Sequence, residues 1–247
     1  MNHPTPDPQY LNVPFSRLYE LQRDREDAVN EERSLTLRMK ARLRRVASTT
    51  CPDHKPKCER CRKMAAQWFA GKGDEREVGA ALELNAPLFV AQVPVHRWRL
   101  ATEKEMVSIA CGSPLAPFVW QTRGFGYLGL AQILAEAGDL SNYANPGKLW
   151  KRFGLAVFDG KAQRRSSDRD LAIEMGFSPR RRAVMWNIGD SLVKQGVKYR
   201  QLYLERKAYE QATSPGLRPI QYHRRAQRFM EKRLLRDLWS FWGRMGE

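Results

Sequence analysis

Apolar residues recur at helical spacing through most of the chain, and the clearest stripe lies near the carboxy-terminal end, between residues 222 and 244. On one face of that segment lie Ala226, Met230, Leu234, Leu238 and Phe241. On another face lie Arg225, Arg228, Lys232 and Arg236. The pattern therefore predicts an amphipathic helix with a basic side.

Two further helical segments precede this one. Ser178, followed by a proline, is placed to cap the first of them, and Gly189 and Gly196 weaken that helix or break it in two. The second runs over residues 199–211 and stops at the turn Ser214-Pro215-Gly216. The last third of the chain is therefore predicted to be helical almost throughout.

Domain boundaries are predicted where this pattern of apolar and polar residues changes. Residues 1–12 contain three prolines and are expected to be disordered, whereas residues 13–48 form a long charged helix. Residues 49–75 hold a Cys/His turn, residues 76–114 form a connector, and residues 115–247 form one helical domain. The expected fold is mostly α, a helical bundle preceded by the long charged helix and the small Cys/His turn.

The long charged helix has too few apolar positions to be stable alone. Either it packs on the body of the protein or it pairs with another copy of the chain. Its heptad pattern is irregular, and self-association through this amino-terminal helix is favoured by a family resemblance that residues 124–155 carry, in which a coiled coil precedes the matching domain.

The connector contains a strand-like stretch from Pro87 to Trp98. The prolines at 87 and 94 lack backbone donors, which predicts an edge strand or an extended segment rather than a central strand. No hydrophobic run in the chain approaches 18 residues, so the sequence excludes a transmembrane span, and no membrane partner is expected.

A glycine bend, Gly124-Phe125-Gly126, precedes a short helix that starts at Tyr127 and stops at Gly138. Asp139 or Ser141 is placed to cap the next turn. A second helix then carries Lys148, Lys151 and Arg152 beside apolar residues. This layout is typical of a helix-hairpin-helix, in which unpaired amides at the positive end of a helix attract phosphate.

These stretches resemble the carboxy-terminal transposase domain of the insertion-sequence transposases of the IS one-ten, one-sixteen and nine-oh-two group. The matching residues are Gly124-Phe125-Gly126, Ile133-Leu134-Ala135-Glu136-Ala137-Gly138-Asp139, Tyr143, Lys148-Leu149 and Gly154-Leu155. A looser match follows at Gly176, Arg181 to Val184 and Lys232 to Trp239. The resemblance implies a DNA-binding domain, and because the family works with a guide RNA, structured RNA is a further expected ligand.

The chain also departs from this family. The family's amino-terminal RNase H-like domain, with four acidic metal ligands, has little room upstream of residue 100. Asp159 stands where the family's nucleophilic serine is expected. Ser166 and Ser167 lie nearby among arginines and are the weak catalytic candidates, although such serines more often contact phosphate. The chain alone is therefore not expected to be an enzyme.

Charge independently favours a polyanionic partner. The chain carries 43 lysines and arginines against 27 aspartates and glutamates, a net charge of +16, and most of the excess lies after residue 160. Arginines cluster at or near predicted helix starts, where side chains and amides can act on one phosphate together. The candidate nucleic-acid-binding residues are Gly124, Gly126, Tyr127, Lys148, Lys151, Arg152, Arg164, Arg165, Arg180, Arg181, Arg182, Arg224 and Arg225.

Three of the four cysteines fall within eleven residues. Cys51, His54, Cys58 and Cys61 form two pairs of ligands, each with a two-residue gap, which suits a tetrahedral Zn²⁺ ion. Because all four positions would be filled by protein, such a zinc would be structural. A reduced structural turn and redox chemistry are the alternatives.

Together these observations predict a cytoplasmic, nucleoid-associated DNA-binding protein of a mobile element or prophage. It would act in DNA transposition or recombination as a non-catalytic or accessory factor. Two alternatives stay open: an active serine-type recombinase subunit that works with a separate nuclease domain, and a structural, regulatory or RNA-binding assembly protein.

Overall fold

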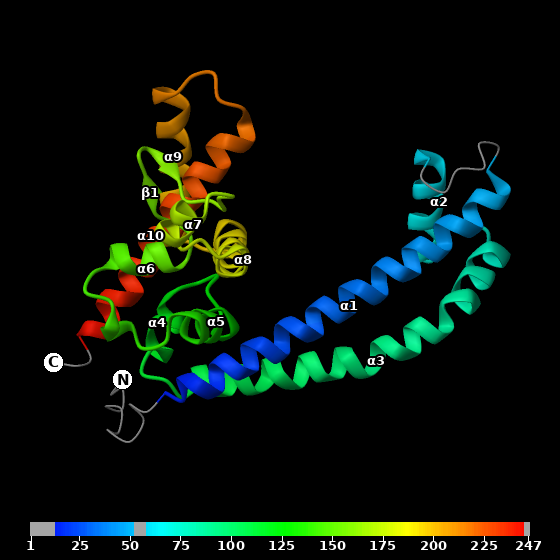
Figure 1. The fold of residues 1–247 in the computed structure, drawn as a ribbon, viewed down its shortest axis with the longest axis horizontal. Coiled ribbons are helices and arrows are strands. Elements are labelled where there is room, and N and C mark those ends of the chain that lie inside the picture. Colours follow the sequence, from blue (N-terminus) through cyan, green and yellow to red (C-terminus); the bar gives the residue numbers. More distant parts are fainter. Residues whose placement is uncertain (1–12, 52–57, 245–247) are drawn as a thin grey trace. The chain divides into compact units, whose positions relative to one another are not determined.

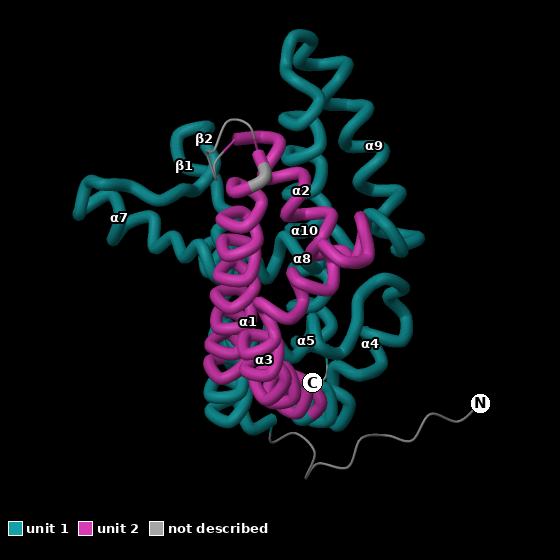
Figure 2. Tube along the Cα trace, turned by 90° about the vertical axis from the view of Figure 1, so that its right-hand side faces the viewer, with its two compact units in different colours: residues 1–22, 105–247 teal, residues 23–104 magenta. Residues whose placement is uncertain are grey.

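The computed structural model describes residues 13–51 and 58–244, so the predicted disordered tail, residues 1–12, lies outside the described residues. Helices dominate the described chain (Figure 1), which confirms the predicted mostly α fold. The chain divides into two compact units (Figure 2). One consists of residues 23–104, and the other joins residues 1–22 to residues 105–247.

The first of these units, residues 23–104, is built from three helices. They are α1 (Phe15–Thr50), α2 (Glu59–Phe69) and α3 (Glu75–Cys111), of which α1 and α3 also extend into the other unit. Arg25 of α1 pairs with Glu103 of α3 at 2.9 Å, and Arg99 of α3 pairs with Glu32 of α1 at 3.0 Å. The long charged helix therefore packs against another helix of the same chain, and its self-association stays a prediction.

The segment from Pro87 to Trp98 is part of α3, so the expected strand or extended connector was wrong. Pro87 and Pro94 are both exposed, and each removes only one helical hydrogen bond on the outer side of the helix. Arg99 and Glu103 of the same helix form ion pairs with α1. Tertiary pairing therefore stabilises a helix that the local proline signals oppose.

Helix α3 also bears on the prediction that no segment of the chain could span a membrane. It is the one helix, among the described residues, that is long and apolar enough by composition to cross a membrane, with a hydropathy of 1.3 over an 18-residue window of which 11% is buried. The exclusion of a span was wrong as argued, because it required an unbroken apolar run and this window includes isolated polar residues. Exposed apolar side chains on α3 include Leu82, Val90, Val93 and Leu100.

The second unit contains the remaining elements. They are α4 (Ala116–Gln121), α5 (Tyr127–Ala137), the 3₁₀ turn η2 (Leu140–Asn142), α6 (Pro146–Arg152), β1 (Val157–Phe158), β2 (Lys161–Ala162), α7 (Arg169–Met175), α8 (Pro179–Gln195), α9 (Lys198–Thr213) and α10 (Pro219–Gly243). Strands β1 and β2 form an antiparallel hairpin in which Val157 is opposite Ala162.

Helix α10 is the central element of this unit and packs against α6, α8 and α9. Ala226, Met230, Leu234 and Leu238 are fully buried along one side of α10, as their spacing predicted. Burial of this stripe supplies the hydrophobic free energy that holds the helices together. The basic side of the same helix remains available to line a surface.

Helix α8 is continuous through Gly189, so the expected weakening at that glycine did not break it. A Cβ atom at Gly189 would lie 2.5 Å from Oε1 of Glu231 and 2.6 Å from Nε2 of Gln227, both on α10. The glycine therefore permits close packing of α8 on α10. The predicted cap is confirmed, since Ser178 accepts a hydrogen bond from the amide of Arg181.

Candidate functional site

The glycine bend before α5 is partly buried in packing contacts. Gly124 has a φ of +87°, and a Cβ atom there would lie 2.8 Å from the backbone nitrogen of Gly196. The Gly124 carbonyl accepts a hydrogen bond of 2.9 Å from Ser191 Oγ. The conformational freedom of Gly124 therefore serves the fit against the end of α8, and its role in phosphate binding stays a prediction. Gly126, by contrast, is exposed at the N-cap of α5.

The second helix of the expected helix-hairpin-helix is α6, separated from α5 by the turn η2. Gly138 ends α5 with a φ of +74°, and Asp139 accepts a hydrogen bond from the amide of Ser141, as predicted. Lys148 and Lys151 are exposed on α6. Arg152 instead donates from Nε to the carbonyl oxygen of Glu136 at 2.9 Å, which ties it to the α5 helix.

The arginines at the start of α8 neutralise two buried glutamates. Arg180 and Arg181 pair with Glu136 at 2.9 and 3.1 Å, and no part of that glutamate side chain is exposed. Arg182 pairs with Glu231, also fully shielded, at 2.9 Å. Much of the charge of these three arginines is therefore offset inside the protein, and their contribution to a phosphate footprint stays a prediction.

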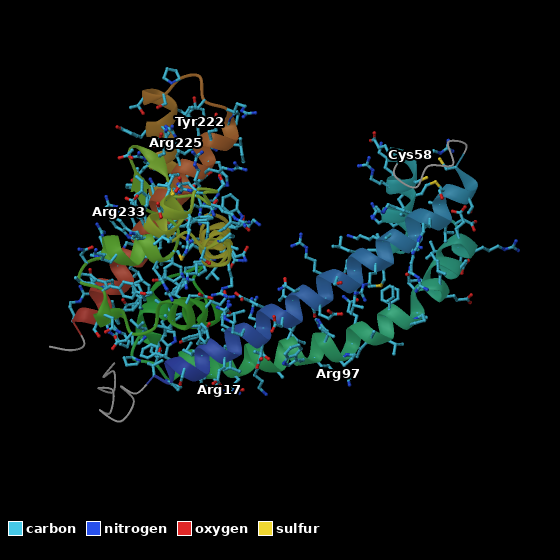
Figure 3. All side chains as sticks on the ribbon, in the orientation of Figure 1. Arg17, Cys58, Arg97, Tyr222, Arg225 and Arg233 are labelled. Carbon is cyan, nitrogen blue, oxygen red and sulfur yellow. The ribbon has the colours of Figure 1, made fainter. Side chains whose placement is uncertain are left out.

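A basic groove, which we call the α10 groove, lies between α9, α10 and the β1–β2 hairpin. Its volume is about 730 Å³. The cations that line it are Lys161, Arg164, Arg206, Arg225, Arg228 and Lys232. Glu210 is the one carboxylate among the described residues that line it. Figure 3 labels Arg225, which projects from the upper half of α10.

Glu210 is only 4% exposed and holds two of these cations in place. Arg206 donates from Nε at 2.8 Å, and Arg225 donates from Nη1 at 2.9 Å. Burial opposes ionisation of Glu210, but these hydrogen bonds outweigh it and hold the pKa of Glu210 below its usual value. One buried carboxylate thus fixes two guanidinium groups at the edge of the groove.

Arg228 and Lys232 lie one helical turn apart on α10 and are crowded by other cations. Burial lowers the pKa of Arg228, and the charge of Arg182 lowers it further, whereas the Glu231 carboxylate acts in the opposite direction. Burial also lowers the pKa of Lys232, with added repulsion from Arg228 and Arg206. Neither side chain forms an ion pair with a carboxylate in the described part of the chain. An anion in the groove would relieve this repulsion.

The basic surface continues beyond the α10 groove. A neighbouring recess of about 230 Å³ is lined by Ala162, Gln221, Arg224, Arg225 and Arg228. A third recess, of about 330 Å³, is lined by Arg182, Trp186, Arg224 and Arg228. Because the three share Arg228, and pairs of them share Arg224 or Arg225, they form one continuous cationic surface along α10.

The structure therefore brings together part of the predicted set and adds to it. Arg164, Arg224 and Arg225 were predicted and line this surface. Lys161, Arg206, Arg228 and Lys232 were missed as site residues. The spacing of Arg224, Arg228 and Lys232 on one helical face was a signal that could have found two of them. Lys161 and Arg206 reach the groove only through tertiary packing.

The weak catalytic candidates lie before α7. The Ser166 hydroxyl accepts a hydrogen bond of 3.1 Å from the amide of Asp168, which is a turn contact. Among the described residues, neither Ser166 nor Ser167 is hydrogen-bonded to a histidine or carboxylate side chain. The base that an activated serine requires is therefore missing from the contacts of these two residues.

Three cysteines gather at the end of α1 and the start of α2. The Sγ atoms of Cys51 and Cys58 are 3.6 Å apart, and all three Sγ atoms, including that of Cys61, lie within 4.8 Å of one another. Figure 3 labels Cys58, where yellow sulfur atoms cluster. This group could hold a metal ion. The proposed fourth ligand, His54, lies outside the described residues.

Local structure positions the cysteine group. Cys58 caps α2, and its Sγ accepts a hydrogen bond of 3.3 Å from the amide of Cys61. Cys51 and Cys61 are buried with Trp68 in the small core of the unit. Burial and hydrogen bonds to the other two thiols raise the pKa of Cys61 to about 12. Metal binding would therefore have to displace the thiol proton.

The sequence and the fold were compared with known proteins. No protein-family model matches the chain, and no curated protein or solved structure matches it either.

Proposed function

We propose that the protein binds DNA by contacts between the phosphate backbone and the α10 groove. The observation that carries this proposal is the pair Arg228 and Lys232, two partly buried cations that line a groove rich in other cations and form no direct ion pair with a carboxylate in the described part of the chain. Clustered cations of this kind raise the free energy of the unbound protein. Phosphates would lower it and would release counterions from the DNA.

The chemistry of the groove suits phosphate oxygens. Guanidinium groups donate two parallel hydrogen bonds to a phosphate, and Glu210 holds Arg206 and Arg225 in fixed positions. Lysines such as Lys161 add positive charge but do not require a fixed hydrogen-bond geometry. Contacts of this class set position and affinity but carry no base information.

We further propose that the protein acts as a non-catalytic or accessory factor in DNA transposition or recombination, related to insertion-sequence transposases. The succession of α5, the turn and α6, with Lys148 and Lys151 exposed, supports this proposal together with the resemblance of the sequence. The contacts of Ser166 favour the non-catalytic form over an active serine recombinase.

For the cysteine cluster we propose structural zinc bound by Cys51, Cys58 and Cys61, with His54 as the fourth ligand. The convergence of three sulfur atoms supports this assignment, since thiolates are preferred ligands of Zn²⁺. The zinc would fasten the end of α1 to the start of α2 and so stabilise the unit.

The DNA proposal is tested by fluorescence anisotropy with a labelled oligonucleotide across a series of salt concentrations. The groove variant Arg228→Gln/Lys232→Gln is expected to bind at least tenfold more weakly. The slope of log K against log salt should become shallower by about 0.9 for each lost phosphate contact on a duplex.

The matched control is Arg97→Gln/Lys104→Gln, which removes the same charge from exposed positions of α3 that form no ion pair within residues 13–51 and 58–244. This control should bind as the wild type does. Equal losses in both variants would mean that overall charge alone attracts DNA, and the groove assignment would be rejected. An RNA oligonucleotide of the same sequence, bound much more tightly than the DNA, would reject DNA as the ligand.

A further inference from the structure

One recess of the cationic surface is lined by residues of both α8 and α10. It is lined by Arg182 and Trp186 of α8 and by Arg224 and Arg228 of α10, and its volume is about 330 Å³. We call it the Trp186 slot. An aromatic ring lies beside three guanidinium groups there, and no carboxylate lines the slot among the described residues.

The ring of Trp186 is held in place from two sides. The His223 ring meets it edge to face, with centroids 5.8 Å apart and an interplanar angle of 88°. His223 is itself fixed by a hydrogen bond of 2.9 Å between its Nδ1 and the hydroxyl of Tyr203. The Arg182 guanidinium lies 5.9 Å from the Trp186 centroid and is anchored to buried Glu231.

This arrangement is suited to a planar, electron-rich ligand that is attached to phosphate. A nucleobase stacks on tryptophan and on guanidinium planes with little dependence on its identity. Arg224 forms no ion pair in the described part of the chain and, with Arg228, is placed for the adjoining phosphates. The α10 groove also contains an aromatic ring, that of Phe229, but the guanidinium groups of Arg206 and Arg233 already lie 5.0 and 4.9 Å from its centroid.

A base inside a duplex cannot use such a slot, because both of its faces are already stacked on neighbouring bases. We propose that the Trp186 slot receives an unpaired nucleobase, so that the protein prefers single-stranded DNA to duplex DNA. This inference rests on the proposed function and adds to it the kind of DNA that is bound. The α10 groove would hold the phosphates on one side of that base.

The test compares a 15-nucleotide single strand with the 15-base-pair duplex of the same sequence, by anisotropy at one salt concentration. The wild type is expected to prefer the single strand. Trp186→Leu should weaken single-strand binding roughly 5- to 150-fold, the loss associated with one stacked base. Its duplex affinity should stay within twofold. Trp186→Phe, which keeps an aromatic face, should restore most of the single-strand affinity.

The matched control is Trp120→Leu, because Trp120 is 67% exposed on α4 and does not line the cationic surface. This variant should bind both forms as the wild type does. A second measurement does not depend on a variant that folds. Photo-crosslinking of an iodouracil-containing single strand to the wild-type protein should label the peptide that contains Trp186.

The outcomes separate the two proposals. If Trp186→Leu leaves single-strand affinity unchanged, or if crosslinks avoid that peptide, the slot assignment is rejected while groove binding stands. Equal affinity of the wild type for both DNA forms also rejects it. If neither form binds in a salt-dependent and groove-dependent manner, the proposed function itself fails.

Discussion

Glu231 of α10 and Arg182 of α8 form an ion pair of 2.9 Å in which the carboxylate is completely shielded from solvent. Gly189 leaves the space that this carboxylate occupies. The pair therefore depends on two helices at once, and it adjoins the Trp186 slot, which Arg182 also lines. A buried acid paired in this way links the stability of the fold to the geometry of the cationic surface.

Glu231 is expected to make stability fall as the pH rises from about 4.5 to about 7. Burial raises the pKa of Glu231 to about 7, although Arg182 acts in the opposite direction. In that interval the unfolded chain has lost the proton that the folded chain keeps, so the free energy of unfolding decreases by at most about 1.4 kcal/mol per pH unit.

The measurement is urea unfolding at a series of pH values for the wild type and for Glu231→Gln. The variant should lose this part of the pH dependence, whatever its absolute stability, and exposed Glu174→Gln should retain it. Glu210 and Asp237, whose pKa values are lowered, contribute in the opposite sense and at lower pH. Parallel curves for wild type and Glu231→Gln would contradict the prediction.

Gly189→Ala is expected to destabilise the protein by about 1–3 kcal/mol, because the added methyl group would overlap Glu231 and Gln227. Alanine normally favours a helix over glycine, so this sign opposes helix propensity. Gly79→Ala in α3 is the matched control, since a Cβ atom there has no neighbour within 4 Å. Thermal unfolding should show a lower melting temperature only for Gly189→Ala.

Removing the arginines that pair with Glu136 is expected to affect folding more than binding. Arg180→Met/Arg181→Met would leave a buried carboxylate uncompensated, at a cost of about 3–5 kcal/mol. Arg164→Met/Arg165→Met changes two exposed arginines and should alter stability by less than about 0.5 kcal/mol. Chemical unfolding of both variants checks this prediction. If the free energy of unfolding of Arg180→Met/Arg181→Met falls by no more than that of Arg164→Met/Arg165→Met, Glu136 does not depend on these cations for its burial.

Metal removal is expected to loosen the junction of α1 and α2. The purified protein should contain one zinc per chain by mass spectrometry of metals, and Co²⁺ substitution should give the absorption bands of tetrahedral thiolate ligation. Cys61→Ser should lose the metal, whereas Cys111→Ser, exposed at the end of α3, should keep it. Full metal retention by Cys61→Ser would exclude this cluster as the site.

The features that the sequence predicted correctly are those whose cause is local. The stripe of α10 from Ala226 to Leu238 follows from helical period alone, and the caps at Ser178 and Asp139 depend on hydrogen bonds within three residues. These signals require no knowledge of distant partners. They fixed the boundaries of α8, α9 and α10 closely and the helical class of the fold.

Only the tertiary structure decided which cations are paired with carboxylates and whether a segment follows its local secondary-structure preference. The sequence grouped Arg180, Arg181 and Arg182 as a phosphate site, whereas the structure pairs them with glutamates on α5 and α10 and leaves Arg182 beside the Trp186 slot. The segment with Pro87 and Pro94 became helical through its pairing with α1. Charge acts through space, and burial depends on the assembled helices, so the α10 groove could be found only after α9, α10 and the β1–β2 hairpin had been brought together.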